Sequence, residues 1–565
     1  IISMVEKKLI KKAGLVLTGV LCLGLFSCKD TPAKITNEDG TVSILKVDPD
    51  EKAISYNKKY DGFNNVTIVN LSKSTKRNPV TIDLSEYANK DVMLEFKMDI
   101  LIDDKTDKKN QLTIILNDVA NDLPKLFDDK VENRKWISVK STMYTHLDEK
   151  RQIFLSGAGW DTNNVTFYIK DFELKITGEN LGAASVSENW MEAKALKDAY
   201  KGIFDYVGFA VGYNNELDRK NVQAGLKYQV DAITMGNEFK PDFIFNWHQP
   251  ATFVDFKGED GKFYKVPAQN PDFVRVDKIL QICKENGLKM RGHVLVWHSQ
   301  TPDWFFRKNW GLNGAKDYVS MSEMTARQEW YIKTVLEHVA AWERDNNDGK
   351  HIIFTWDVVN EAASDGATDT AWLRTDSNWY KVYNSDKFIV NAFRFANKYA
   401  SKDVKLAYND YGEYSPQKVK AICKIIDAIQ AAPDARIDIL GMQAHVQIKY
   451  PPVYGEGSFE QAIQTYAAKG LNIQVTELDV ANDKAMYNPF EMKARYNDLY
   501  RMFVKNRKTA DKNGVEGVTI WGLNDETTWL NAMQNYAGHT QYPLLFRTGE
   551  YMCKPCFYGV LEAAE

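Results

Sequence analysis

Apolar and polar residues alternate through the first third of the chain, in short runs that favour extended strands. Clusters of Asn, Asp, Gly and Lys separate these runs, which cover residues 65–71, 92–102, 111–116, 135–141, 151–155 and 165–176. A period of two places alternate side chains in a core and in solvent. The pattern predicts an all-β, jelly-roll-like sandwich domain.

The pattern changes near residue 185, and beyond residue 190 apolar strands alternate with helices. The eight strand candidates are residues 207–211, 232–238, 289–298, 352–361, 405–411, 439–446, 472–479 and 518–524. Eight strand-helix units in succession predict an α/β fold, a (β/α)8 TIM barrel.

Three of the intervening helices carry clear signals. Residues 273–286 have a helical apolar stripe, and Gly287 follows as a C-terminal stop. Ser458 with Gln461 forms a capping box for a helix that we expect to end at Gly470. A second apolar stripe consists of Val419, Ile422, Ile426 and Ile429.

The amino terminus has the pattern of a secretory signal. Four lysines precede the apolar residues 13–27, a stretch too short to span a bilayer comfortably, and Cys28 follows at once. The sequence Leu-Phe-Ser-Cys at 25–28 resembles a bacterial lipoprotein cleavage box. We therefore expect secretion across the inner membrane and lipidation of Cys28, with anchoring to the cell envelope at the outer membrane. The alternative is an ordinary signal peptide with an incidental cysteine.

These boundaries give a domain scheme for the whole chain. It consists of a signal peptide (1–28), a linker (29–40), a β-sandwich (41–180), a second linker (181–189) and a barrel (190–565).

Composition excludes several classes of protein. The 565 residues carry 72 basic and 76 acidic side chains, a net charge of 72 − 76 = −4, without a basic block that would indicate nucleic-acid binding. The 14 Trp and 28 Tyr suit stacking on sugar rings as well as core packing. Membrane association is expected only through the lipid.

The cysteines and the short motifs indicate no metal or cofactor. Beyond the signal only Cys283, Cys423, Cys553 and Cys556 remain, without zinc-ligand spacing. Cys553 and Cys556 form either a tight disulfide or two buried thiols. There is no HExxH, phosphate-binding loop or dinucleotide fingerprint. We predict that the protein needs neither a metal nor a cofactor.

Reactive side chains gather where six of the predicted strands end. They are Asn237, Glu238 and Lys240; His293, Trp297, His298 and Gln300; Asn360 and Glu361; Gln443 and His445; Glu477 and Asp479; and Trp521, Asn524 and Asp525. One polar residue at a strand end is explained by capping of the next helix, but six such strands are not. The carboxyl ends of barrel strands form the active-site face, so these residues are expected to converge on one cleft.

Two glutamates in such a cleft indicate glycoside hydrolysis. Glu361 and Glu477 can serve as a protonated acid and an ionised nucleophile. Asn360 can bind a hydroxyl, His445 can orient a carboxylate, and Trp521 with Trp529 can stack on sugars. A metal hydrolase is the alternative, with ligands from His293, His298, His445, Glu477 and Asp479, but their spacing matches no ligand motif.

Residues 195–560 resemble glycoside hydrolase family 10, the retaining endo-β-1,4-xylanases. The resemblance rests on Arg-Gly-His-Val-Leu-Val-Trp-His-Ser-Gln at 291–300 with Trp304, Trp-Asp-Val-Val-Asn-Glu at 356–361 and Val-Thr-Glu-Leu-Asp at 475–479. Trp-Gly-Leu-Asn-Asp at 521–525 with Trp529, Pro-Leu-Leu-Phe at 543–546 and Lys-Pro at 554–555 also fit.

This resemblance implies roles for the matching residues. Glu361 would be the acid/base, and Glu477 the nucleophile that carries a covalent glycosyl group, with His445 and Asp479 supporting it. The implied sugar-binding residues are Asn237, Lys240, His293, Trp297, Gln300, Asn360, Gln443, Trp521 and Trp529. The implied substrates are xylan and xylo-oligosaccharides, and we expect a monomer.

The chain departs from the family pattern at two positions. Gly236 stands where a glycone-side carboxylate is usual, and Leu530 where a basic residue is common. Glu238 is a candidate substitute for the lost carboxylate.

The sandwich domain weakly resembles the carbohydrate-binding modules attached to such xylanases. Trp136, Tyr144 and Trp160 are its candidate platforms, although aromatic residues of this kind more often belong to a core. A spacer that lifts the enzyme from a membrane is the alternative.

Other functions remain open for the whole chain. One is an endo-β-1,4-glucanase or another retaining barrel glycosidase. Another is a non-catalytic glycan-binding lipoprotein on the cell surface, against which the intact Glu361 and Glu477 argue.

Overall fold

The computed structural model describes residues 41–42, 52–73, 81–83, 90–106, 110–116, 125–147, 152–156, 164–178, 188–269, 271–482, 488–532, 541–547 and 550–565. The expected signal peptide with Cys28, the linker 29–40 and Trp160 lie outside these residues. In the described part, no helix combines the length and the apolar character needed to cross a membrane.

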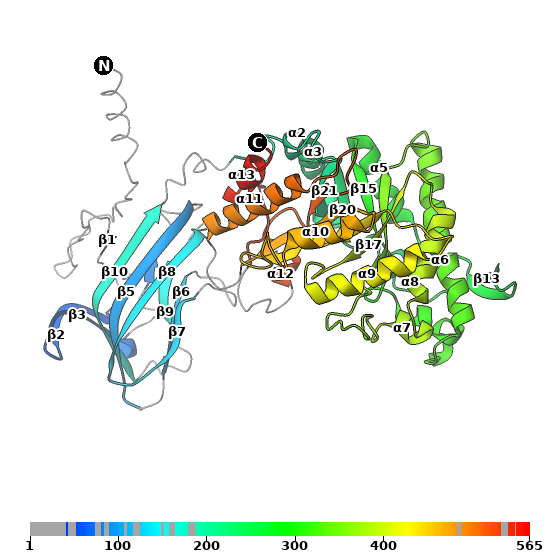
Figure 1. Cartoon of the computed structure of the whole chain (residues 1–565). Coiled ribbons are helices and arrows are strands. Elements are labelled where there is room, and N and C mark those ends of the chain that lie inside the picture. The colour runs from blue at the N-terminus through cyan, green and yellow to red at the C-terminus, as the bar shows by residue number, and fades with distance from the viewer. Residues whose placement is uncertain are drawn as a thin grey trace, which may run out of the picture. The chain divides into compact units, whose positions relative to one another are not determined.

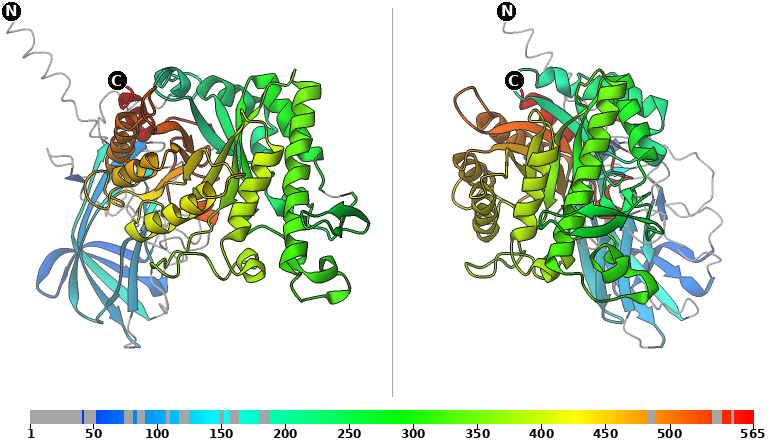
Figure 2. Two further views of the ribbon diagram at one scale, coloured as in Figure 1. Left: turned by 45° about the vertical axis from the view of Figure 1, so that its right-hand side comes forward. Right: turned by 90° about the vertical axis from the view of Figure 1, so that its right-hand side faces the viewer.

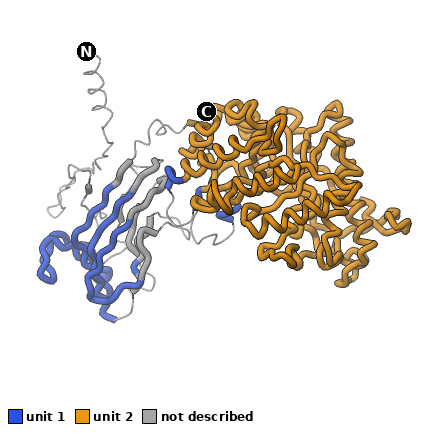
Figure 3. The backbone as a smooth tube through the Cα atoms, viewed as in Figure 1, with its two compact units in different colours: residues 1–187, 482–491, 529–542 blue, residues 188–481, 492–528, 543–565 orange. Residues whose placement is uncertain are grey.

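The chain forms two compact units (Figure 3). The first contains residues 1–187, 482–491 and 529–542, and the second contains residues 188–481, 492–528 and 543–565.

The first unit contains two antiparallel sheets, which confirms the predicted sandwich (Figure 1). One sheet has the order β2-β3-β10-β5-β8, with β1 also paired to β10, and the other has the order β4-β9-β6-β7. The strands are β1 (Thr41–Val42), β2 (Ile54–Tyr60), β3 (Phe63–Asn70), β4 (Thr81–Asp83), β5 (Lys90–Asp104), β6 (Asn110–Leu116), β7 (Lys125–Val131), β8 (Trp136–Leu147), β9 (Gln152–Ser156) and β10 (Val165–Gly178).

Alternate residues of the long strands build the sandwich core. Phe96, Met98 and Ile100 of β5 are at most 2% exposed, and they pack with Phe167 and Ile169 of β10. The intervening residues lie on the opposite face of the sheet, as the period of a strand requires.

The second unit is a closed parallel barrel of eight strand positions, as predicted. Neighbouring strands follow the order β11-β12-β15-β16-β17-β18-β20-β21, and pairing of β21 with β11 closes the ring. The strands are β11 (Tyr206–Val211), β12 (Ala232–Met235), β15 (Lys289–Trp297), β16 (Ile353–Asn360), β17 (Lys405–Asp410), β18 (Ile439–Met442), β20 (Asn472–Ala481) and β21 (Val515–Ile520).

Helices cover the outside of the barrel (Figures 1 and 2). The longer ones are α3 (Lys220–Gln229), α5 (Val274–Asn286), α6 (Met321–Asn346), α8 (Lys387–Tyr399), α9 (Pro416–Gln430), α10 (Phe459–Ala468), α11 (Pro489–Lys505) and α13 (Pro555–Glu562). Short helices are α2 (Leu196–Ala199), α4 (Pro241–Ile244), α7 (Asn378–Tyr383) and α12 (Trp529–Ala532), and β13 (Phe253–Lys257) pairs with β14 (Phe263–Pro267) in a hairpin.

The expected helix signals act as predicted. Gly287 ends α5 in the left-handed region with φ +67°, which costs glycine little. The Ser458 side chain accepts a hydrogen bond from the Gln461 N–H at 3.2 Å and caps α10. The helix ends at Ala468, two residues before the expected Gly470.

The largest differences between the predicted and the observed strand ends are in the second, sixth and eighth strands. The second and eighth strands end earlier than expected, so Asn237 and Trp521 lie in the segments that follow them. The sixth strand is broken, because Ala444 takes φ +61° between β18 and the short β19 (His445–Gln447). Cys553 and Cys556 are buried, and no disulfide joins them.

Candidate active site

The barrel brings most of the predicted site residues to the carboxyl ends of its strands. We call this set the strand-end cluster: Asn237, Lys240, His293, Trp297, Gln300, Asn360, Glu361, Gln443, His445, Glu477, Asp479 and Trp521. Trp529 begins α12 in the first unit, so its predicted contact with sugar stays a prediction.

Glu361 directly follows the fourth strand, and neutral groups donate the hydrogen bonds to its carboxyl. Its Oε2 accepts a hydrogen bond from Trp297 Nε1 at 2.8 Å. Its Oε1 accepts from Asn360 Nδ2 at 3.1 Å and from Gln443 Nε2 at 2.9 Å. The backbone of Glu361 has φ +55°, a costly conformation for a residue with a side chain, and strain of this kind gathers at functional sites.

His298 lies 3.8 Å from Glu361 Oε2 and adds no charge there. Burial lowers the pKa of His298 to about 4, and the charge of Arg374 acts in the same direction. The imidazole is therefore neutral at neutral pH.

Glu477, on the seventh strand, has a cationic partner. Its Oε2 lies 3.2 Å from His445 Nε2, and His445 Nδ1 lies 2.9 Å from Asp479 Oδ1. Burial opposes a charge on His445, but the carboxylates of Asp479 and Glu477 raise the pKa of this imidazole well above its usual range. Burial also favours the neutral form of Glu477, but the His445 hydrogen bond and the fields of His293 and His445 hold its pKa below the usual value. Glu477 is thus a carboxylate paired with an imidazolium.

Two asparagines link the glutamates through a short chain of hydrogen bonds. Asn409 Nδ2 donates to Glu477 Oε1 and to Asn360 Oδ1, both at 2.9 Å. Asn360 in turn donates to Glu361. Sequence reasoning missed Asn409, although it is the last residue but one of the fifth strand and so obeys the same strand-end rule as the other members.

A buried ion pair inside the barrel supports His293. Asp357 Oδ2 lies 2.9 Å from His293 Nδ1, and Arg291 donates to both oxygens of Asp357, at 3.0 and 2.5 Å. Although burial favours the neutral carboxyl, Arg291 and His293 lower the pKa of Asp357. The His293 ring meets the edge of Trp521 at 5.6 Å between centroids, which fixes both rings.

Lys240, Asn237 and Gln300 form a polar group beside Trp297. Lys240 Nζ donates to Asn237 Oδ1 at 3.1 Å and to Gln300 Oε1 at 2.8 Å, and it lies 4.9 Å from the Trp297 ring centroid. Burial lowers the pKa of Lys240, against the pull of nearby carboxylates that include Glu477. Donors and acceptors of this kind suit sugar hydroxyls.

Glu238, the candidate substitute for the lost carboxylate, is bound by backbone N–H groups, and its contact with sugar stays a prediction. It is 6% exposed, and its oxygens accept backbone N–H bonds from Tyr213 at 2.9 Å and Asn237 at 3.3 Å. At Gly236 a Cβ would have only the Val211 carbonyl oxygen within 4 Å, at 3.7 Å. The space that a larger side chain could use at this position stays open.

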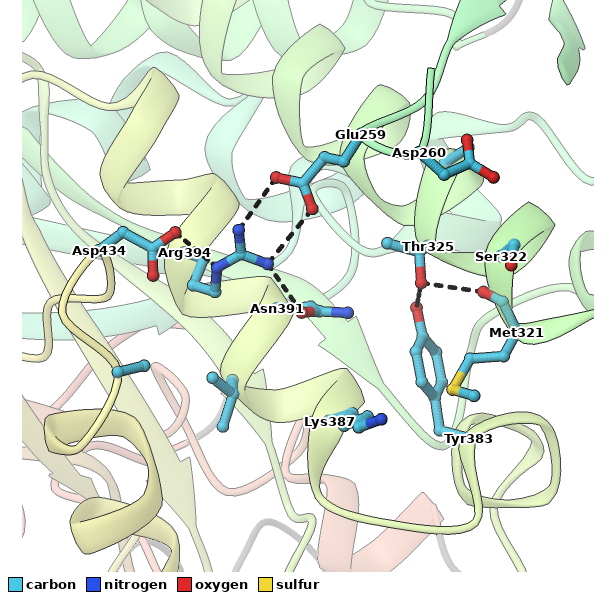
Figure 4. A pocket seen from close by; sticks show the side chains of 13 residues that line it. Glu259, Asp260, Met321, Ser322, Thr325, Tyr383, Lys387, Asn391, Arg394 and Asp434 are labelled. Carbon is cyan, nitrogen blue, oxygen red and sulfur yellow. Dashed lines mark hydrogen bonds and ion pairs between the residues drawn. The ribbon is translucent and has the colours of Figure 1, made fainter. Parts of the chain in front are cut away.

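A separate hollow of about 590 Å³ lies outside the barrel, between α6, α8 and the tip of the β13–β14 hairpin. Figure 4 shows Arg394 between the carboxylates of Glu259 and Asp434, at 3.0 and 2.6 Å. The Arg394 guanidinium in this hollow is therefore already paired with carboxylates. The side chains suited to catalysis lie at the strand-end cluster instead. The described residues include no group of three or more His, Cys, Asp or Glu side chains arranged to hold a metal ion.

Comparisons with known proteins agree with this geometry. The family model of glycosyl hydrolase family 10 matches residues 195–563. Endo-1,4-beta-xylanase Y of Acetivibrio thermocellus is 30% identical over 442 residues, which are 76% of this chain but 38% of that protein. A putative endo-1,4-beta-xylanase of Caldicellulosiruptor saccharolyticus is 36% identical over 294 residues, 50% of this chain and 87% of that protein.

Solved structures also match the chain. The CBM22-1 and GH10 modules of endo-1,4-beta-D-xylanase 10B of Clostridium thermocellum, complexed with xylohexaose, match with a TM-score of 0.54 and 25% identity. That match covers 91% of this chain and 93% of that one. The model match covers well over half of the sequence, and the chain therefore belongs to glycosyl hydrolase family 10.

Proposed function

We propose that this chain is a retaining endo-β-1,4-xylanase that acts on xylan and xylo-oligosaccharides. The observation that carries the proposal is the unequal set of partners of the two linked glutamate carboxyls, with a cation beside Glu477 and neutral hydrogen-bond donors to Glu361. A retaining glycosidase needs this division, because one carboxyl must donate a proton while the other attacks as an anion. The names of the relatives indicate xylan as the substrate.

In the first step Glu361 donates its proton to the glycosidic oxygen. Glu477 attacks the anomeric carbon, the bond to the leaving oxygen breaks, and a covalent glycosyl-enzyme forms. Trp297 and Gln443 hold the Glu361 carboxyl in place during the transfer. His445 and Asp479 keep Glu477 ionised and oriented until attack.

In the second step Glu361, now a carboxylate, takes a proton from water. The oxygen of this water attacks the anomeric carbon as the proton leaves, and the bond to Glu477 breaks. Two inversions retain the β configuration, and each carboxyl returns to its starting state.

The remaining members of the cluster would hold the sugars. We assign Asn237, Lys240, His293, Gln300, Asn360, Gln443 and Trp521 to hydroxyl or ring contacts, with Trp297 beneath Lys240. The tight hydrogen bonds among them fix their positions before substrate arrives, which lowers the cost of orienting it.

A product assay tests the proposal. Purified full-length protein should release short xylo-oligosaccharides from xylan and leave carboxymethylcellulose nearly untouched. Glu477→Ala should lose about 10²- to 10⁴-fold in kcat. Preferred cleavage of carboxymethylcellulose would favour an endoglucanase, and wild-type protein inactive on both would favour a glycan-binding protein without catalysis.

We further propose that the sandwich is a glycan-binding module. A match over 91% of the chain to a xylanase with a CBM22-1 module supports this idea. Trp136 and Phe63 form an edge-to-face pair at 5.6 Å, and Phe63 is 41% exposed. Trp136 Nε1 donates to Asp61 Oδ2 at 2.8 Å, which helps to hold its ring against Phe63. The side chains of Tyr144 and Trp160 are not described.

We also propose a lipid on Cys28 and a monomeric enzyme on the outer membrane. The apolar segment that ends in Leu-Phe-Ser-Cys supports the lipid. Detergent-phase partition of protein expressed in a bacterial envelope should be lost in Cys28→Ala. Light scattering of the released protein should give the monomer mass.

A further inference from the structure

Glu413 is a fully buried carboxyl close to the strand-end cluster but not part of it. It follows the fifth strand and is 0% exposed. Its Oε1 accepts the Ala444 N–H at 3.0 Å, and its backbone oxygen accepts the Tyr466 hydroxyl at 2.7 Å. Its Oε2 finds no hydrogen-bond partner among the described residues. Such a group is costly to bury, which calls for an explanation.

The peptide that Glu413 holds is a bend with an unusual conformation. Ala444 has φ +61°, and it separates β18 from β19. Alanine has no intrinsic preference for this region, so surrounding contacts must maintain the bend. The Tyr414 hydroxyl donates to the next carbonyl, that of His445, at 3.1 Å. Glu413 and Tyr414, neighbours in one loop, thus both hydrogen-bond to the backbone of this bend.

The residues on either side of the bend each contact one glutamate. Gln443 Nε2 donates to Glu361 Oε1 at 2.9 Å. His445 Nε2 lies 3.2 Å from Glu477 Oε2. In a straight strand these two residues, two positions apart, would share one face, so the bend at Ala444 sets the direction of one side chain relative to the other. Rotation of the Ala444 peptide would therefore displace both contacts together.

The protonation state of Glu413 fits this task. Burial raises its pKa to about 8, while His445 of β19 lowers it and Asp410 of β17 raises it. Lys418 of α9 pairs with Asp410 at 2.9 Å, and Tyr466 of α10 contacts the Glu413 backbone. At neutral pH the carboxyl is uncharged and presents a carbonyl oxygen to the Ala444 N–H.

We propose that Glu413 is a positioning residue for both glutamates: its hydrogen bond to Ala444 fixes the bend that places Gln443 on Glu361 and His445 on Glu477. The inference rests on the proposed function, since it assigns Glu413 to the same reaction.

Two substitutions separate the hydrogen bond from the volume of the side chain. Glu413→Gln keeps an oxygen acceptor and the uncharged state, whereas Glu413→Met keeps the approximate length and burial but removes the acceptor. Glu343 offers a matched control at the opposite end of the barrel. It is 2% exposed, and its Oε1 accepts the N–H groups of Ile352 and Ile353 at 2.7 and 2.9 Å.

We expect Glu413→Gln to keep kcat within about twofold on an aryl β-xylobioside with an activated leaving group. Glu413→Met should lose about 10- to 100-fold in kcat with KM within about twofold, since small displacements of catalytic groups have effects of this size. Glu343→Met should lower the thermal midpoint at least as much as Glu413→Met while kcat stays unchanged.

Three results would overturn the proposal: full kcat in Glu413→Met, equal losses in the Gln and Met variants, or an equal loss in Glu343→Met. A wild-type enzyme without glycosidase activity would refute the proposed function instead. The positioning would then be tested by ¹⁵N-histidine NMR, which is tractable with 8 histidines. In Glu413→Met the His445 imidazole should titrate at lower pH than in wild type, and an unchanged titration would refute the proposal.

Discussion

At the scale of single residues, the partners of two similar side chains decide their chemistry. Glu361 and Glu477 are both nearly buried, at 9% and 5% exposure. Only Glu477 has an imidazolium within hydrogen-bond distance, and this partner favours its ionised form against the effect of burial. The adjacent His298 cannot play that part for Glu361, because burial lowers its pKa to about 4. Charge, rather than burial, therefore distinguishes the attacking group from the proton donor.

Azide rescue tests this division of roles. Removal of the nucleophile lets azide attack the substrate from the vacated face, so Glu477→Gly with an activated aryl xyloside should give an inverted α-xylosyl azide. Removal of the acid/base spares the first step for a good leaving group, and azide then attacks the glycosyl-enzyme, so Glu361→Ala should give the β-xylosyl azide. NMR of the products distinguishes the anomers. The opposite pattern would reverse the two assignments.

The titration of Glu413 predicts a dependence of stability on pH. In the folded state its carboxyl keeps the proton up to about pH 8, whereas in the unfolded chain it loses the proton near pH 4.5. Between these values the folded state binds more protons than the unfolded state, so the contribution of Glu413 to the free energy of unfolding falls as pH rises. Outside this pH range the contribution is constant. The thermal midpoint of wild type should drop by a few degrees relative to Glu413→Gln between pH 4.5 and 8. Parallel curves would show that the group ionises normally.

At the scale of elements, close packing sets which substitutions the barrel tolerates. Gly225 lies in α3, where alanine is ordinarily better by about 1 kcal/mol. A Cβ there would lie 1.9 Å from Trp190 Cζ2, so the ring would have to move. We expect Gly225→Ala to lower the free energy of unfolding by about 2 kcal/mol or more, measured by denaturant titration. Lys227→Ala, at an exposed position of the same helix, should change it by less than about 0.5 kcal/mol.

The bend in the sixth strand gives a second prediction at this scale. Glycine adopts φ +61° without the steric cost that alanine bears. Ala444→Gly should therefore keep or raise the thermal midpoint, yet loosen the peptide between Gln443 and His445. We expect kcat to fall several-fold on an aryl β-xylobioside. A stable variant with full kcat would mean that the bend needs no fixed conformation.

Strand positions and strand-end chemistry could be predicted, because both follow from a local pattern. The apolar runs predicted all eight barrel strands. The rule that the carboxyl ends of barrel strands form the active site predicted His293, Glu361 and Glu477 as site residues. The bend at Ala444 carries no local signal, since neither glycine nor proline occurs there. Asn409 was predictable from its place near the carboxyl end of an apolar strand. The role of Glu413 was not, because it depends on contact with a segment 31 positions away.

At the scale of the whole molecule, each unit has its own core and its own candidate contact with glycan. The barrel carries the two glutamates, while the sandwich exposes Phe63 beside Trp136. A module that only binds raises the local concentration of polymer near an enzyme in the same chain, without changing the chemical step. The contributions of the two units to activity should therefore be distinguishable by comparing polymeric with short substrates.

Comparison of polymeric and short substrates tests this separation. Burial of the exposed part of the Phe63 ring on a glycan is worth ~1 kcal/mol, which is about fivefold in affinity. Phe63→Ala should thus bind and hydrolyse insoluble xylan several-fold less well, while its kcat/KM on xylohexaose stays at the wild-type value. Phe263, 67% exposed on the barrel hairpin, supplies the matched control, and Phe263→Ala should leave both substrates unaffected. If Phe63→Ala binds insoluble xylan as wild type does, Phe63 is not a contact residue and the sandwich fits better as a spacer. A loss on xylohexaose as well would mean that the substitution disturbs the barrel.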